Sequence, residues 1–137
     1  MPLSVGYYVY SMQTRARDRL RRTRQTIVRL AQEISELVPV LLESQPIVKG
    51  IVYEHRRKCG KPNCACATGE PHNSMILSRS EEGRTRLIKI PEGMLVDLKI
   101  LTGRYQRFRR ARARLGQIYK KMVSLLDQLE KARRQEP

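Results

Sequence analysis

Apolar residues recur every seven positions in two long segments of this chain, and this repeat constrains the fold more than any other feature. In the first segment the repeat forms two lines, Leu20, Ile27, Ile34 and Leu41, and Ala16, Thr23, Leu30 and Leu37. The pattern predicts a long helix over residues 12–46. Pro39 should kink or end this helix near Leu37 and Val38, because proline lacks a backbone donor and restricts the residue before it.

The second heptad repeat predicts a longer helix over residues 92–135. Pro91 and Glu92 suit its start, since proline loses no needed hydrogen bond there and a carboxylate is favoured at the positive end of a helix. Its two lines are Met94, Leu101, Phe108, Leu115, Met122 and Leu129, and Leu98, Tyr105, Arg112, Tyr119 and Leu126. Arg112 is the only charged residue in these lines, where it could fix register or partner choice.

Neither helix can bury its apolar lines alone, so each must pair. The simplest arrangement is an antiparallel pair within the chain, with the intervening residues inserted at its tip. That register places Leu41 near Leu95 and Leu20 opposite about residue 116. A homodimer through the longer helix is an alternative that the sequence leaves open.

The residues between the two helices show the pattern of a small sheet. Residues 47–53 alternate with period two, which predicts a strand. Residues 75–77 and 85–90 predict a hairpin with Gly83 at its turn. Residues 56–73 are rich in Gly, Pro, Cys and Asn and are expected to lack regular structure.

The sequence therefore predicts a mostly helical α+β protein, in which two long coiled-coil-like helices flank a small three-stranded antiparallel sheet with a zinc-knot loop. Its parts form one domain over residues 1–137. They are an N-terminal arm that docks on another surface (1–11), the first helix (12–46), a zinc-knot β module (47–91) and a long basic helix (92–135).

Three cysteines and a histidine are the basis of a predicted zinc site. Cys59, Cys64, Cys66 and His72 form a C-x4-C-x-C-x5-H set, and four such ligands are what a closed structural zinc site requires. His55 is a possible substitute for His72. Free thiols in a loop are the alternative, whereas a disulfide framework is disfavoured by the odd cysteine count and a redox or nucleophilic cysteine lacks the flanking pattern.

The run Cys59-Gly60-Lys61-Pro62-Asn63-Cys64-x-Cys66, with Gly69 and His72 after it and a hairpin and basic helix beyond, resembles a family of small uncharacterised prokaryotic proteins. The family carries a CGKPxCxC...H module, and the resemblance covers about residues 48–115. In that family the histidine usually precedes Gly-Pro and a run of tyrosines, where this chain has Asn73-Ser74-Met75. The resemblance implies that the cysteines and the sheet form one module, and it implies no activity.

Charge points to the class of partner. The chain has 28 Lys and Arg against 13 Asp and Glu, a formal net charge of +15, and 20 of the cations are Arg. A surplus of this size favours a polyanion such as nucleic acid, since Arg grips phosphate with two bonds. The candidate contact residues are Arg15, Arg17, Arg19, Arg21, Arg22, Arg24, Arg56, Arg57, Lys58, Lys61, Arg84, Arg86, Arg104, Arg107, Arg109, Arg110, Arg114, Lys120 and Lys121.

The function that these features predict is a DNA-binding accessory protein acting with a recombinase, transposase or other nucleoprotein machine. An RNA-binding subunit of a ribonucleoprotein and a coiled-coil interaction protein, self-associating or docked on a protein partner, are the alternatives. The sequence has no paired carboxylate motif and no phosphate-binding glycine loop, so we expect no enzyme activity and no catalytic residues. It also lacks a long apolar stretch and a secretion signal, which predicts a cytoplasmic protein without membrane contact, associated with nucleoid or ribonucleoprotein.

Overall fold

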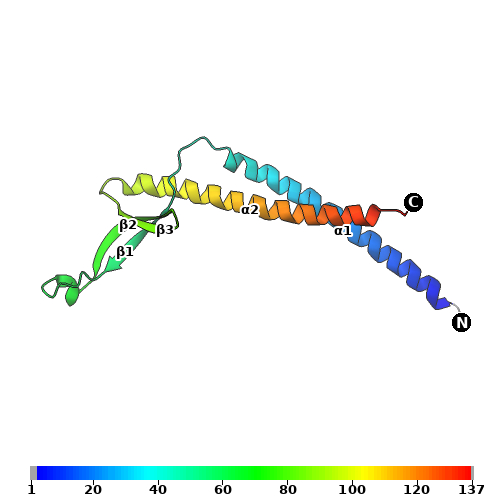
Figure 1. Ribbon diagram of the computed structural model, residues 1–137, viewed down its shortest axis with the longest axis horizontal. Helices are drawn as coiled ribbons and strands as arrows, with labels where there is room; N and C mark the ends of the chain where they lie inside the picture. The colour runs from blue at the N-terminus through cyan, green and yellow to red at the C-terminus, as the bar shows by residue number, and fades with distance from the viewer. Residues whose placement is uncertain (1–2, 137) are drawn as a thin grey trace. The chain divides into compact units, whose positions relative to one another are not determined.

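The computed structural model describes residues 3–136, which form two long helices and a three-stranded sheet (Figure 1). The elements are α1 (Leu3–Leu41), β1 (Ile51–Arg57), the short 3-10 helix η1 (Ala65–Ala67), β2 (His72–Glu81), β3 (Arg84–Lys89) and α2 (Leu95–Arg133). The predicted α+β class, with two helices and an antiparallel three-stranded sheet, is confirmed. No helix in the described part of the chain is both long enough and apolar enough to cross a membrane.

The chain divides into two compact units. Unit 1 takes the residues up to Leu42 and those from Ala111 onward, and unit 2 takes Glu43–Arg110. Helix α2 contributes its first turns to unit 2 and the rest to unit 1.

Helix α1 is longer at its start and shorter at its end than predicted. Residues 3–11, expected as an arm, are helical, while residues 1 and 2 of that arm lie outside the described residues. At the other end, Pro39 lies inside the helix, which continues to Leu41, so of the two predicted effects of Pro39, a kink or an end, the end near Leu37 is wrong. Only Val40 and Leu41 of the helix follow the proline, so the missing backbone donor falls in the last turn.

The core of unit 1 confirms the apolar lines of α1 and the first line of α2, whose Leu115, Met122 and Leu129 are half-buried, and it corrects the second line of α2. Leu30, Ile118 and Leu125 form a buried cluster, packed by Ile27, Ile34, Leu37 and Met122. In the part of α2 that belongs to unit 1, the buried positions are Ala111, Ile118 and Leu125, each one residue before a position of the second line. The displaced residues Arg112, Tyr119 and Leu126 are exposed. The buried positions keep the seven-residue spacing but are offset by one residue, because Ile118 and Leu125 pack with Leu30 of α1.

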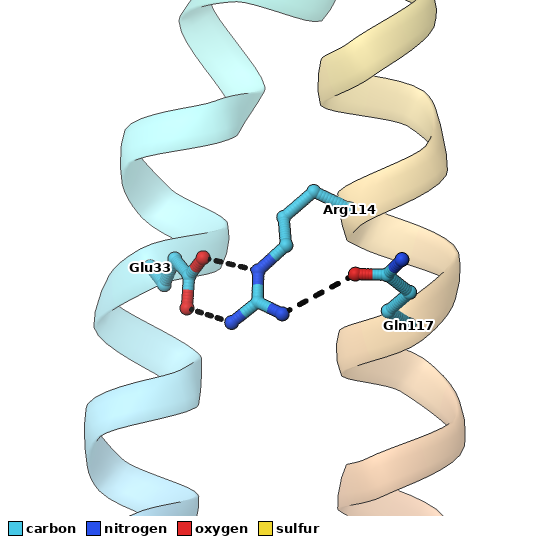
Figure 2. A network of polar contacts seen from close by, with 3 residues as sticks. All are labelled: Glu33, Arg114 and Gln117. Atoms are coloured by element: carbon cyan, nitrogen blue, oxygen red, sulfur yellow. Dashed lines mark hydrogen bonds and ion pairs between the residues drawn. The ribbon is translucent and has the colours of Figure 1, made fainter.

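The two helices of unit 1 run antiparallel, but not in the predicted register. Arg114 donates two hydrogen bonds to Glu33, at 2.5 and 2.8 Å, and a third to Gln117 at 3.4 Å (Figure 2). The predicted register would have put residue 103 opposite Glu33. The same offset places Leu20 beside Gln128 and Ala132 instead of residue 116.

The segment after α1 explains this offset. Within unit 2, residues 43–50 run beside the first turns of α2 and bond to it. Arg107 pairs with Glu43 at 2.5 Å, and the Val48 N–H donates to the Leu101 carbonyl at 3.2 Å. The antiparallel pairing therefore begins well inside α2, instead of at its first residue.

The Glu33–Arg114 pair gives a testable pH dependence. The hydrogen bond from Arg114 lowers the pKa of Glu33 below its ordinary value of 4.5. A carboxyl with a depressed pKa in the folded state adds stability above pH 4.5, and this contribution disappears as the pH falls through the folded-state pKa. We expect Glu33→Gln to lower the melting temperature more at pH 7 than at pH 3. An equal loss at both pH values would contradict this.

The sheet of unit 2 has the order β1-β2-β3 with both pairs antiparallel. Glu82 and Gly83 have φ values of 51° and 77° and form the β2–β3 turn, which confirms the predicted hairpin. Strand β1 begins at Ile51 and not at Ile47. Gly50 ends the preceding segment with φ 137°, and a Cβ there would lie 2.7 Å from Leu77 Cδ1, so only glycine permits this approach.

The start of α2 also differs from its prediction. The helix begins at Leu95 and not at residue 92. Pro91 and Glu92 belong to a turn that closes with a 3.3 Å hydrogen bond from the Met94 N–H to the Pro91 carbonyl. Gly93 in this turn has φ 86°, which no helical residue adopts, and Met94 is 49% exposed.

Candidate metal centre

The four predicted metal ligands lie together in unit 2. The sulfur atoms of Cys59, Cys64 and Cys66 and a ring nitrogen of His72 all lie within 4.8 Å of one another. The Cys59 and Cys66 sulfurs are 3.4 Å apart, and Cys64 Sγ is 3.1 Å from His72 Nε2. Three cysteines and a histidine at these distances could hold one metal ion.

The ends of two paired strands bring these ligands together. Arg57, the last residue of β1, pairs with His72, the first of β2. Cys59 comes two residues after Arg57 and therefore lies near the histidine. Residues 56–73, expected to lack regular structure, therefore include strand residues at both ends and η1 between them. Figure 1 shows this connection as a compact turn beyond the ends of β1 and β2.

Tight turns inside the connection place the other two cysteines. Cys64 precedes η1 and Cys66 lies within it. Hydrogen bonds from the Cys64 N–H to Lys61 and from the Gly69 N–H to Ala65, at 3.2 and 2.9 Å, close the turns. The Cys59 N–H points at the Cys66 sulfur, 3.4 Å away, as backbone donors do toward thiolate ligands.

The environment shifts the pKa values of two of the thiols in opposite directions. A hydrogen bond from the Lys61 backbone, together with Cys66 and His72, lowers the pKa of Cys59 to about 6. The Cys59 backbone lowers the pKa of Cys66, but burial and the neighbouring Cys59 and Cys64 thiols outweigh it, so that pKa is raised. Metal ligation needs thiolates, and Cys59 is ready to supply one near neutral pH.

The donor set fits a tetrahedral ion. Bonds of about 2.3 Å to sulfur correspond to ligand separations of about 3.8 Å, and the separations here reach 4.8 Å at most. His55, the possible substitute for His72, does not belong to the group. It lies on β1, where its ring packs edge-on against Tyr53 at a centroid distance of 6.3 Å.

The candidate nucleic-acid residues are divided between the two units. Unit 1 holds 14 Lys and Arg against 6 Asp and Glu, a net charge of +8, and unit 2 holds 14 against 7, a net of +7. In unit 1, one hollow between α1 and α2 brings together Arg15, Arg19, Arg22 and Lys121 with the single acid Asp18. The candidates Arg104, Arg107, Arg109 and Arg110 belong to unit 2 with those of the β module.

Ion pairs within the protein already hold some candidates. Within residues 3–136, five of the 19 have a carboxylate within 4 Å, which leaves 14 without one. The five pairs are Arg21–Asp18, Arg56–Glu54, Arg86–Glu81, Arg107–Glu43 and Arg114–Glu33. Arg104 instead donates to the Pro46 carbonyl at 3.3 Å.

Arg79 and Lys89 are the two strand cations outside this set of 19, although Arg79 was expected as a possible base-specific contact. Arg79 pairs with Glu81 at 2.5 Å, and its Nε atom is buried without a partner. Lys89 is exposed at the end of β3. Side chains alternate along a strand, so known strand bounds would have placed Arg79 and Lys89 on opposite faces of the sheet.

One family model, described as a domain of unknown function (DUF6788), matches residues 14–94. The comparisons with curated proteins and with solved structures gave no match. The matched region holds 81 of the 137 residues, including the whole sheet and all four residues of the metal centre. It starts earlier and ends earlier than the resemblance over residues 48–115 implied. The chain therefore belongs to the uncharacterised DUF6788 family.

Proposed function

We propose that this chain is a nucleic-acid-binding accessory protein without catalysis of its own, which binds DNA beside a recombinase, transposase or other nucleoprotein machine. The observation that carries the proposal is the hollow of unit 1, where four cations from two helices meet around one acid. Asp18 already faces a further cation, Arg21, at 3.9 Å. The field at this hollow is therefore positive, and a phosphate backbone would relieve the repulsion among the guanidinium groups.

The distribution of ion pairs supports the same proposal. Glu33 holds Arg114, whereas Arg15, Arg19 and Arg22 have no carboxylate within 4 Å in the described residues. Cations left without acids are available to phosphates. A helix pair of this kind would act as a basic rod, with coiled-coil packing of its apolar lines.

The metal centre has a structural part in this proposal. We take its ion to be zinc, because three thiolates and an imidazole in a closed four-ligand set are typical of structural zinc sites. Cys59, Cys64, Cys66 and His72 would hold it, and the ion would fix the end of the β1–β2 hairpin. Lys58 and Lys61 lie beside the first cysteine and would offset the charge of the thiolates.

Salt titration of duplex DNA binding tests the proposal. If about 6–8 cations contact phosphates, the logarithm of affinity should fall against the logarithm of salt concentration with a slope of about −5 to −7. The double variant Arg19→Gln, Arg22→Gln should reduce the magnitude of this slope by about 2. The measurement is fluorescence anisotropy of a labelled duplex, with structured RNA as competitor to separate DNA from RNA binding.

The matched control removes two cations that acids already hold. Arg107→Gln with Arg114→Gln carries the same net charge as the first variant, yet both of its arginines pair with glutamates. We expect this control to keep the slope of the unmodified protein. Binding that does not respond to salt, or equal slopes in the two double variants, would refute the proposal.

A further inference from the structure

The two faces of the sheet differ in exposure. Alternate residues of a strand point to opposite faces, and the strand register puts Ile51, Ser78 and Leu87 in one row and Tyr53, Ile76 and Lys89 in the next. We call this side the open face; its edge-strand residues include Ile51, Tyr53, His55, Arg57, Leu87 and Lys89. On the edge strands, Ile51 is 56% exposed and Leu87 51% exposed, whereas Val52 and Ile88 on the opposite face are half-buried. In the central strand, Ile76 and Leu77 are both buried.

The charges of the sheet are also divided by face. Both carboxylates of the three strands, Glu54 and Glu81, belong to the opposite face, where Glu54 pairs with Arg56 and Glu81 with both Arg79 and Arg86. The open face has two strand cations, Arg57 and Lys89. Within residues 3–136 neither has a carboxylate within 4 Å. The open face is thus cationic and free of acids.

Aromatic rings lie between these cations. Tyr53 is 37% exposed and its ring lies 6.3 Å from that of His55, at an interplanar angle of 83°. Tyr53 shares its row with Lys89, and His55 is two residues from Arg57 along the same strand. An exposed ring flanked by unpaired cations on a sheet is suited to an unpaired base with its phosphates. Duplex bases are stacked on one another and offer only their edges.

We propose that the open face binds a single-stranded segment of nucleic acid, with a base stacked on Tyr53 and phosphates held by Arg57 and Lys89. The exposed Ile51 and Leu87 would contact a neighbouring base. This inference rests on the proposed function and assigns a second surface to it, separate from the arginines of unit 1.

The test uses the full-length, metal-loaded protein and labelled 15-nucleotide oligo(dT) and oligo(U), so that single-stranded DNA and RNA are compared directly. Tyr53→Ala should weaken binding by about 5- to 150-fold, the usual effect of losing one stacked base. Tyr53→Phe keeps the ring and should bind like the unmodified protein. Ultraviolet cross-linking with mass spectrometry should place the attached nucleotide on the peptide that carries Tyr53.

Two adjacent arginines provide the matched control. Arg57→Gln should reduce the magnitude of the salt slope for oligo(dT) by about 0.7, whereas Arg56→Gln, on the opposite face and paired with Glu54, should not change it. If folded Tyr53→Ala and Arg57→Gln both bind oligonucleotides normally, the inference is wrong, although salt-dependent duplex binding would still support the proposed function. If the unmodified protein binds no polynucleotide, both are wrong.

Discussion

Replacing His72 with alanine is expected to abolish the proposed zinc binding of the purified protein, from about one ion per chain to almost none. The imidazole is one of only four donors within 4.8 Å of one another, and no other histidine joins them in the described residues. Loss of a partner in the outer shell of a zinc site costs roughly 10- to 100-fold in affinity, and loss of a direct ligand should cost more. Elemental analysis and native mass spectrometry measure the metal content.

The other histidine is the natural control. His55 lies on β1 against Tyr53 and outside the cluster, so His55→Ala should retain its zinc. Chelation of the unmodified protein should also expose the bonds after Arg57 and Lys58 to rapid cleavage by trypsin, because the connection between β1 and β2 loses its ligands. A metal-free protein, or zinc retained by His72→Ala, would rule out this site.

Replacing Ile118 with alanine is expected to lower the free energy of unfolding by about 2–5 kcal/mol. Ile118 is 1% exposed, the most deeply buried large side chain among the described residues, and it lies in the cluster of Leu30 and Leu125. Truncation removes buried methyl groups and leaves a cavity that the surrounding structure closes only in part. Urea denaturation followed by helical circular dichroism measures the loss.

The adjacent residue provides the comparison. Tyr119 is 69% exposed, although the heptad pattern predicted it in an apolar line. We expect Tyr119→Ala to change the free energy of unfolding by no more than about 0.5 kcal/mol. If Tyr119→Ala proved the more damaging of the two, the buried line of α2 would be the one that the strict repeat predicts.

These helices show how far the sequence pattern determines the fold. In α1, the two predicted seven-residue lines have no apolar neighbouring lines to compete with them, and Thr23 and Leu30 are buried as predicted. In α2, Ile118 and Tyr119 are both apolar neighbours, so periodicity cannot choose between them and the partner helix decides. The register was missed for a related reason. It depends on where residues 43–50 bond to α2, and backbone bonds such as Val48 to Leu101 leave no pattern in the sequence.

The metal centre was predictable because its chemistry depends on residue type and close spacing. The four ligands lie within 14 residues, and their types alone indicated a metal site. The secondary structure around the four ligands was harder to predict from the sequence. Glycine, proline and asparagine are depleted in strands, yet Arg57 and His72 are paired strand residues because the ladder extends to the edge of the cluster. The open face became recognisable only with the register, since it combines residues of three strands.

The pairing of Glu33 with Arg114 joins residues 81 positions apart, which affects how the protein is made. At about 5–20 residues per second, a ribosome needs roughly 4–16 s to add that length of chain. During this interval α1 has been synthesised while its partner has not, and the whole of β1, β2 and β3 is produced in between. The small sheet can therefore assemble before the helical pair closes, so chains released before α2 is complete should expose the apolar lines of α1 although the sheet has already folded.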